Sequence, residues 1–131
     1  MSKAKSIKEE HTMYEQLDRV TLAFGTGDTS VSKGIKESLV SRKSCPLAVV
    51  KYAKIYVPNF TAAITATLQI KDAEGHVLFS KGTIAKNGAT AIGADELKDV
   101  PVQDSSKITV VLTGAPVSAG NVYVDLYIHR D

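Results

Sequence analysis

The clearest pattern in the chain is an alternation of apolar and polar side chains near its C-terminus. From Val122 to Ile128 every second residue is valine, leucine or isoleucine, and the residues between them are tyrosine or aspartate. Successive side chains of a strand point to opposite faces, so this stretch predicts a strand with one buried face. Residues 106–113 are rich in β-branched residues and predict a second strand. A Gly/Pro/Ser-rich connection joins the two, so we expect them to form a hairpin.

Similar alternation recurs along the rest of the chain. It predicts short strands over residues 17–24, 49–57, 61–71, 76–81 and 89–92, with a short piece over 83–86 and an irregular segment over 37–44. Along 49–57 the odd-numbered side chains are expected on one face and the even-numbered ones on the other. Residues 72–75 and 87–88 have the composition of hairpin turns. A turn-rich loop is expected over 25–36, and a single helical turn at 95–97.

Seven or eight short strands with no convincing helix between them predict an all-β fold. Each amphipathic sheet must bury its apolar face on another sheet. We therefore expect an antiparallel β-sandwich of the jelly-roll or immunoglobulin-like kind, with an open barrel as the alternative. Residues 1–16 are polar and charged and predict a flexible N-terminal arm, with or without a short helix. Residues 17–131 would then form a single β-sandwich domain.

Composition and charge narrow the class of protein only slightly. The 131 residues suit one domain, and a net charge of +2 is too small to argue for a nucleic-acid partner. Residues 1–54 hold 10 basic against 6 acidic side chains, so the first part is mildly basic. That asymmetry would help docking on a charged surface, although chance accounts for it equally well. We find no signal-peptide pattern and no apolar run near the roughly 20 residues of a membrane span, so we expect a protein made in the cytoplasm, without a membrane partner.

Residues with catalytic or metal-binding chemistry do not gather into a recognised motif. The segment 25–28, Gly-Thr-Gly-Asp, meets neither the Walker nor the dinucleotide pattern. The three histidines are scattered and Cys45 is the single thiol, so we expect neither a disulfide nor a metal site. The acidic residues 95, 96 and 99 lack the spacing of a calcium loop and predict a solvated turn. The expectation is a protein that is not an enzyme and that carries no cofactor.

Four tyrosines are the most distinctive surface candidates. They form two pairs, each spaced to lie on one face of its strand, and His129 continues the second face. Exposed tyrosines fill protein interfaces or stack on sugars, whereas simple packing against the sandwich edge is the alternative. The lysines of the arm would suit a negatively charged partner. The predicted partner interface comprises Tyr52, Tyr56, Tyr123, Tyr127, His129, Lys3, Lys5, Lys8 and Tyr14.

Three stretches carry a resemblance to a known group of proteins. Residues 57–75 (Val-Pro-Asn-Phe-Thr-Ala-Ala-Ile-Thr-Ala-Thr-Leu-Gln-Ile-Lys-Asp-Ala-Glu-Gly), 77–82 and 108–115 resemble small β-sandwich virion proteins of tailed bacteriophages, which decorate or cement the head. The resemblance covers about residues 57–131 and brings no active-site residues. It implies a structural virion protein bound to the major capsid protein or other virion subunits, as a trimer or dimer whose arm clasps a neighbour. A carbohydrate- or surface-binding module is the alternative, and a small β-fold enzyme has no motif in its favour.

Overall fold

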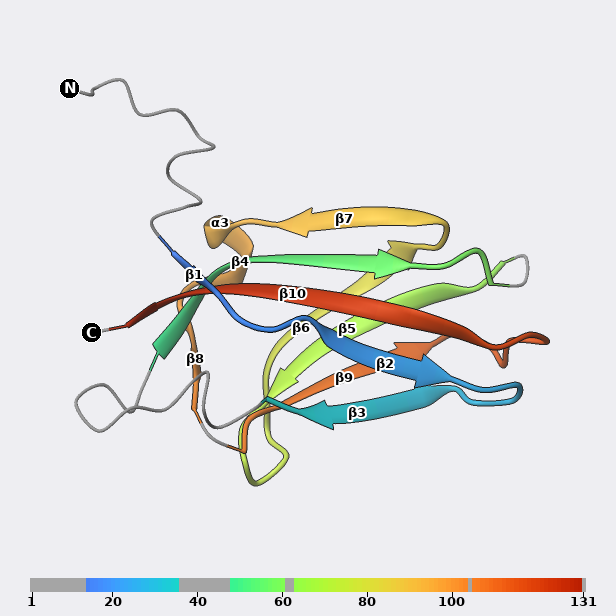
Figure 1. The fold of residues 1–131 in the computed structure, drawn as a ribbon, viewed down its shortest axis with the longest axis horizontal. Helices are drawn as coiled ribbons and strands as arrows, with labels where there is room; N and C mark the ends of the chain where they lie inside the picture. Colours follow the sequence, from blue (N-terminus) through green and yellow to red (C-terminus); the bar gives the residue numbers. More distant parts are fainter. Residues whose placement is uncertain (1–13, 36–47, 61–62, 104, 131) are drawn as a thin grey trace, which may run out of the picture.

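The chain folds into an antiparallel β-sandwich of two sheets, as the alternation predicts (Figure 1). The computed structural model describes residues 14–35, 48–60, 63–103 and 105–130. Within these ranges lie ten strands and one short helix. In chain order they are β1 (Glu15–Gln16), β2 (Val20–Phe24), β3 (Ser30–Gly34), β4 (Ala48–Val57), β5 (Thr65–Lys71), β6 (Val77–Ala85), β7 (Gly88–Ile92), α3 (Ala94–Leu97), β8 (Val100–Val102), β9 (Lys107–Leu112) and β10 (Gly120–Arg130).

The larger sheet is built around its two longest strands. Strands β10 and β4 pair at its centre, with β1 and β2 along the free side of β10 and with β7 and β8 along the free side of β4. Strands β3, β9, β5 and β6, in that order, form the second sheet. Figure 1 shows β10 and β4 running side by side along the length of the sandwich. Their outer faces therefore form the middle of one broad surface.

The core is aliphatic, as the absence of tryptophan and the small number of phenylalanines imply. The inward rows of the central strands are fully buried, and each such side chain contributes roughly 1.5–3 kcal/mol on burial. Phe24 and Phe60 meet edge to face at one end of this core, with ring centroids 5.9 Å apart. The side chains with no exposed area include Val122, Val124, Leu126, Ile128, Ala66, Leu68, Ile70, Ile108 and Val110.

A β-bulge in β4 changes which of its residues face the core. Tyr52 pairs with Tyr127, but Val50 pairs with the next residue, Ile128, so Lys51 is an extra residue on β4. Such an insertion shifts the inward–outward alternation by one position. The predicted alternation holds for 53–57, where the odd-numbered residues are buried, and is wrong before the bulge, where Val50 is buried instead.

The predicted C-terminal hairpin is wrong, because its two strands lie in different sheets. Strand β9 pairs with β3 and β5, whereas β10 pairs with β1, β2 and β4. Each strand has its own inward-facing aliphatic row, which is compatible either with neighbours in one sheet or with strands that face each other. The connection over residues 113–119 is long enough to cross the roughly 10 Å that separates packed sheets.

Strands β3 and β8 carry too little alternation of apolar and polar residues to be predicted from the sequence. Strand β3 lies inside the predicted loop 25–36, and four of its five residues are exposed, because it is a sheet edge whose partner among the described strands is β9. Strand β8 contains Pro101 and pairs with β4. Sequence alternation detects strands with one buried face, so short polar edge strands escape it.

The first strand of the larger sheet lies before the predicted domain boundary at residue 17. Glu15 and Gln16, the last residues of the predicted arm 1–16, pair with Ile128 and Tyr127 of β10. The backbone N–H of Leu17 then donates to the carbonyl of Leu126 at 2.9 Å. Residues 1–13, and the segment predicted over 37–44, lie outside the described residues.

Candidate functional site: the tyrosine face

Three cross-strand pairs line the outer face of the larger sheet. Tyr56 lies opposite Tyr123, Lys54 opposite Asp125, and Tyr52 opposite Tyr127. Outward residues of a strand recur every second position, so the β-bulge at Lys51 leaves these three pairs in one continuous row. With a rise of about 3.4 Å per residue, the row extends over about 14 Å. We call these six residues together with Arg19 the tyrosine face.

At one end of the row the two tyrosine rings contact each other. The ring centroids of Tyr52 and Tyr127 are 5.3 Å apart and their planes make an angle of 62°, which is an edge-to-face arrangement. Pairs of this geometry stabilise cross-strand contacts beyond the area that they bury. Because the rings are inclined to each other, they do not form the flat platform on which a crystalline polysaccharide would lie.

At the other end a guanidinium group lies between the two tyrosine rings. The Arg19 Cζ atom is 4.9 Å from the ring centroid of Tyr56 and 5.0 Å from that of Tyr123. Cations within about 6 Å of a ring centroid are attracted by the π electrons of the ring. The Lys54 Nζ atom is also close to Tyr56, 5.8 Å from its centroid. Two cations therefore share one aromatic ring.

Asp125 holds the guanidinium of Arg19 in place. Arg19 Nε donates to Asp125 Oδ1 and Nη2 donates to Oδ2, both at 3.0 Å. This two-point geometry is the strongest form of the arginine–carboxylate pair. The side chain of Asp125 is 4% exposed, whereas that of Arg19 is 47% exposed. The hydrogen bonds to Asp125 raise the pKa of Arg19.

The ammonium of Lys54 is held among the tyrosine side chains. Its pKa is raised, first by the charge interaction with Tyr56 and by a hydrogen bond to it, and less by Tyr52 and Tyr127. Lys54 and Arg19 thus keep their positive charges at neutral pH. The one carboxylate of the tyrosine face, that of Asp125, is buried under Arg19. The charges that the face presents to solvent are therefore positive, on the exposed Arg19 and the half-buried Lys54.

A shallow groove borders the tyrosine face at its Arg19 end. It has a volume of about 250 Å³ and runs between the ends of β4, β7 and β10. Tyr56 and Tyr123 form one wall, and Asn121 contributes an amide that lies 3.5 Å from the hydroxyl of Tyr123. The remaining lining residues are Val57, Pro58, Gly88 and Ala89.

Of the residues predicted for an interface, the structure brings the four tyrosines together. His129 is exposed on β10 beyond Tyr127, opposite Val49, and Tyr14 is half-buried just before β1. Lys3, Lys5 and Lys8 lie outside the described residues. An interface at these positions remains a prediction.

No sequence motif marks Arg19, Lys54 or Asp125 as functional residues. Lys54 and Asp125 occupy the outward positions between the tyrosines of their own strands, so strand periodicity places them on the same face. Their pairing depends on the register of β4 and β10, and the position of Arg19 depends on the pairing of β2 with β10. Neither register is encoded in a local motif.

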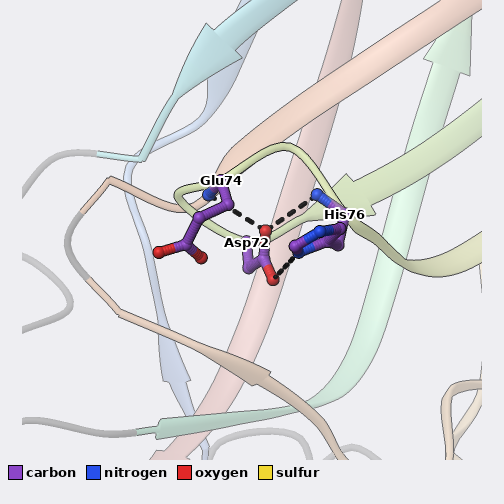
Figure 2. Close-up of side chains that lie close together, drawn as sticks. All are labelled: Asp72, Glu74 and His76. Atoms are coloured by element: carbon purple, nitrogen blue, oxygen red, sulfur yellow. Dashed lines mark hydrogen bonds and ion pairs between the residues drawn. The ribbon is translucent and has the colours of Figure 1, made fainter.

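The turn between β5 and β6 gathers three side chains of the kinds that bind metals. Figure 2 shows Asp72, Glu74 and His76 with the hydrogen bonds that join them. Asp72 Oδ1 accepts the backbone N–H groups of Glu74 at 3.0 Å and His76 at 2.8 Å, and Oδ2 lies 3.1 Å from His76 Nδ1. Partial burial raises the pKa of Asp72, but the hydrogen bonds with His76 outweigh this and the net pKa is lowered. Both carboxylate oxygens already serve to close the hairpin.

The other residues considered in the sequence analysis either have partners close to them in the structure or lie outside the described residues. Glu96 pairs with Lys81 and Asp99 pairs with Lys51, each at 2.6 Å, so two members of the predicted acidic turn are in ion pairs. In segment 25–28 the carboxylate of Asp28 accepts the backbone N–H of Gly25, which closes a tight turn. Cys45 is outside the described residues. Within the part of the chain that the structure describes, no helix is long and apolar enough to span a membrane.

Comparison with known proteins shows the fold and no family. No protein-family model and no curated protein matches the chain. A fucose-binding module of Streptococcus pneumoniae is similar, with 12% identity, 83% of this chain and 72% of that chain covered, and a TM-score of 0.54. The capsid asymmetric unit of cyanophage Pam1 has 14% identity, coverages of 87% and 81%, and a TM-score of 0.49. The Bacillus endospore appendages, which form disulfide-linked pili, have 13% identity, coverages of 86% and 85%, and a TM-score of 0.45.

Proposed function

We propose that this chain is a non-enzymatic structural virion protein that decorates a phage capsid, and that the tyrosine face is its attachment surface. The main observation in support is the row of four tyrosines with Arg19 fixed between two of them. Tyrosine and arginine are the residue types that concentrate binding energy at protein interfaces. The resemblance of residues 57–131 to phage head proteins supports the capsid as the partner.

Rigidity of the tyrosine face supports the same role. Six of its seven residues lie on the two central strands of the larger sheet, and the seventh, Arg19, is held by two hydrogen bonds to Asp125. Little side-chain freedom would be lost when a partner packs against such a surface, because the geometry exists before binding. Many copies on a lattice would then gain strength from multivalency, even if each single contact is weak.

The test is co-sedimentation with purified capsids of the phage whose genome encodes the chain, stripped of the native copy. We expect the wild-type protein to sediment with the capsids at saturating stoichiometry. The Tyr123→Ala and Tyr127→Ala variants should weaken binding by about tenfold or more, as interface hot spots do. Thr67→Ala, on the outer side of β5 in the other sheet, is the matched control and should bind as the wild type does. Binding that survives both tyrosine substitutions would exclude this attachment surface.

The second candidate function is a carbohydrate-binding module, favoured by the groove beside Tyr56 and Tyr123. Two tyrosine rings and the amide of Asn121 offer the stacking surfaces and hydrogen bonds that sugars require. A glycan array separates the two candidates. A glycan hit that is lost on Asn121→Ala and Tyr123→Ala, without capsid binding, would replace the capsid proposal with this one.

A further inference from the structure

The two cations of the tyrosine face, the exposed Arg19 and the half-buried Lys54, lie close to one ring. Arg19 Cζ and Lys54 Nζ lie 4.9 Å and 5.8 Å from the ring centroid of Tyr56. Both positive charges lie within 5.8 Å of the same ring centroid, so they repel each other, and a carboxylate that approaches both would offset that repulsion. The carboxylate of the tyrosine face, Asp125, does not fill this role, because both of its oxygens accept hydrogen bonds from Arg19.

Arg19 keeps donor capacity on its exposed side. A guanidinium group has five N–H bonds, and the two-point pair with Asp125 uses two of them. The Arg19 side chain is 47% exposed although its partner is nearly buried, so a ligand can approach the remaining donors from solvent. An incoming carboxylate would find a guanidinium already oriented, with the ammonium of Lys54 on β4 close to the same tyrosine ring.

The surroundings strengthen such a contact. Tyr52, Tyr56, Tyr123 and Tyr127 are all half-buried and enclose the two cations along the row. When a partner covers the rings, water leaves and charge-assisted hydrogen bonds gain strength in the lower dielectric environment. With the one acidic side chain of the tyrosine face buried, charge complementarity favours a partner surface that presents aspartate or glutamate.

Resting on the proposed function, we propose that the tyrosine face binds an acidic segment of a protein partner, whose carboxylate is received between Arg19 and Lys54 beside the ring of Tyr56. The row is about 14 Å long, which matches an extended partner segment of about four residues. We assign the bound carboxylate to an aspartate or glutamate side chain of the partner protein. The test compares it with the carboxylates of an acidic polysaccharide.

The first experiment follows backbone amide signals of the ¹⁵N-labelled full chain during titration with poly-L-glutamate, and separately with polygalacturonate. We expect saturable shifts for poly-L-glutamate that centre on Lys54, Tyr56 and Asp125. Lys54→Met keeps the aliphatic stem and should weaken binding by about tenfold or more, whereas Lys54→Arg should retain it. Lys107→Met removes the same charge from β9 of the other sheet and should leave the affinity within about twofold of wild type.

Three results would overturn the inference. These are equal losses for Lys54→Met and Lys107→Met, shifts spread over the whole surface, or tighter binding of polygalacturonate than of poly-L-glutamate. The melting temperature of each variant establishes that it is folded. If Lys54→Met does not fold, the affinity of Lys54→Arg for poly-L-glutamate provides the test.

Capsid co-sedimentation at low and at high salt separates this inference from the proposed function. If wild type binds capsids, and Lys54→Glu binds equally well without salt dependence, the attachment role stands and the acidic contact is wrong. If wild type fails to bind capsids but binds poly-L-glutamate through Lys54, the acidic contact stands and the capsid role is wrong.

Discussion

Arg19 and Asp125 lie 106 positions apart in the sequence, and two hydrogen bonds of 3.0 Å join their side chains on the outer face of the larger sheet. The carboxylate is almost completely buried while the guanidinium is half exposed. A buried carboxylate is tolerated only when it is paired, so Asp125 depends on Arg19. This pair links the segment before β2 to the central strand β10 and fixes the cation that the tyrosine face presents.

The first prediction concerns the dependence of Asp125 on Arg19. Arg19→Met should lower the melting temperature, because it leaves a buried charge without its partner. The double variant Arg19→Met/Asp125→Val should recover much of that loss, because it removes the unpaired charge as well. Thermal unfolding followed by circular dichroism measures both. A double variant that is less stable than Arg19→Met would show that the pair contributes something other than charge compensation.

The second prediction concerns close packing at Gly120, where β10 begins. A Cβ atom there would lie 2.9 Å from the ring of Phe60 and 3.1 Å from Cγ of Pro58. Overpacking of this kind costs about 1–3 kcal/mol, so Gly120→Ala should reduce the free energy of unfolding by that amount. Denaturation in urea measures it. Gly88→Ala is the control, since nothing lies within 4 Å of its added Cβ.

Phe60→Leu provides the complementary test of this contact. The smaller side chain should make room for the methyl group added at position 120, so Gly120→Ala should cost less in that background than in the wild type. Equal costs in the two backgrounds would mean that the Phe60 ring is not the obstacle.

The third prediction concerns the place where the domain begins. Leu17 is 3% exposed, and its backbone N–H is bonded to the carbonyl of Leu126. Leu17→Ala should therefore cost about 2–5 kcal/mol, as cavity-forming substitutions in a core do. Gln16→Ala, at an exposed position in β1, should change the free energy of unfolding by less than about 0.5 kcal/mol. A small effect of Leu17→Ala would place the start of the folded core nearer β2.

Sequence periodicity predicted the layers of this fold because each central strand carries its own signal. The alternation from Val122 to Ile128 identifies its buried face whichever strands lie beside it. Periodicity does not predict which strands pair, because the same pattern would result whether β9 paired with β10 or faced it across the core. Edge strands such as β3 gave no signal, since both of their faces are largely exposed.

The sequence predicted each pair of tyrosines in the candidate site, but not how the two pairs come together with Arg19. Periodicity indicated that Tyr123 and Tyr127 share a face, and likewise Tyr52 and Tyr56. The pairing of these two sets requires the antiparallel register of β4 and β10, which a bulge at Lys51 adjusts. Arg19 lies just before β2, and only the packing of β2 beside β10 brings it to the tyrosines.

The last prediction concerns the pH dependence of the hairpin turn between β5 and β6. Partial burial acts to raise the pKa of Asp72, but the N–H and imidazole of His76, with the N–H of Glu74, bring it below its ordinary value of 3.8. A carboxyl group whose pKa is lower in the folded than in the unfolded state stabilises the fold at every pH above its unfolded-state pKa. This contribution is lost as the pH falls through the folded-state pKa. The melting temperature of the wild type should therefore exceed that of Asp72→Asn above about pH 4, and the difference should shrink as the pH falls further, because the amide of the variant does not titrate. A difference that does not change with pH would mean that the turn is closed by groups other than the Asp72 carboxylate.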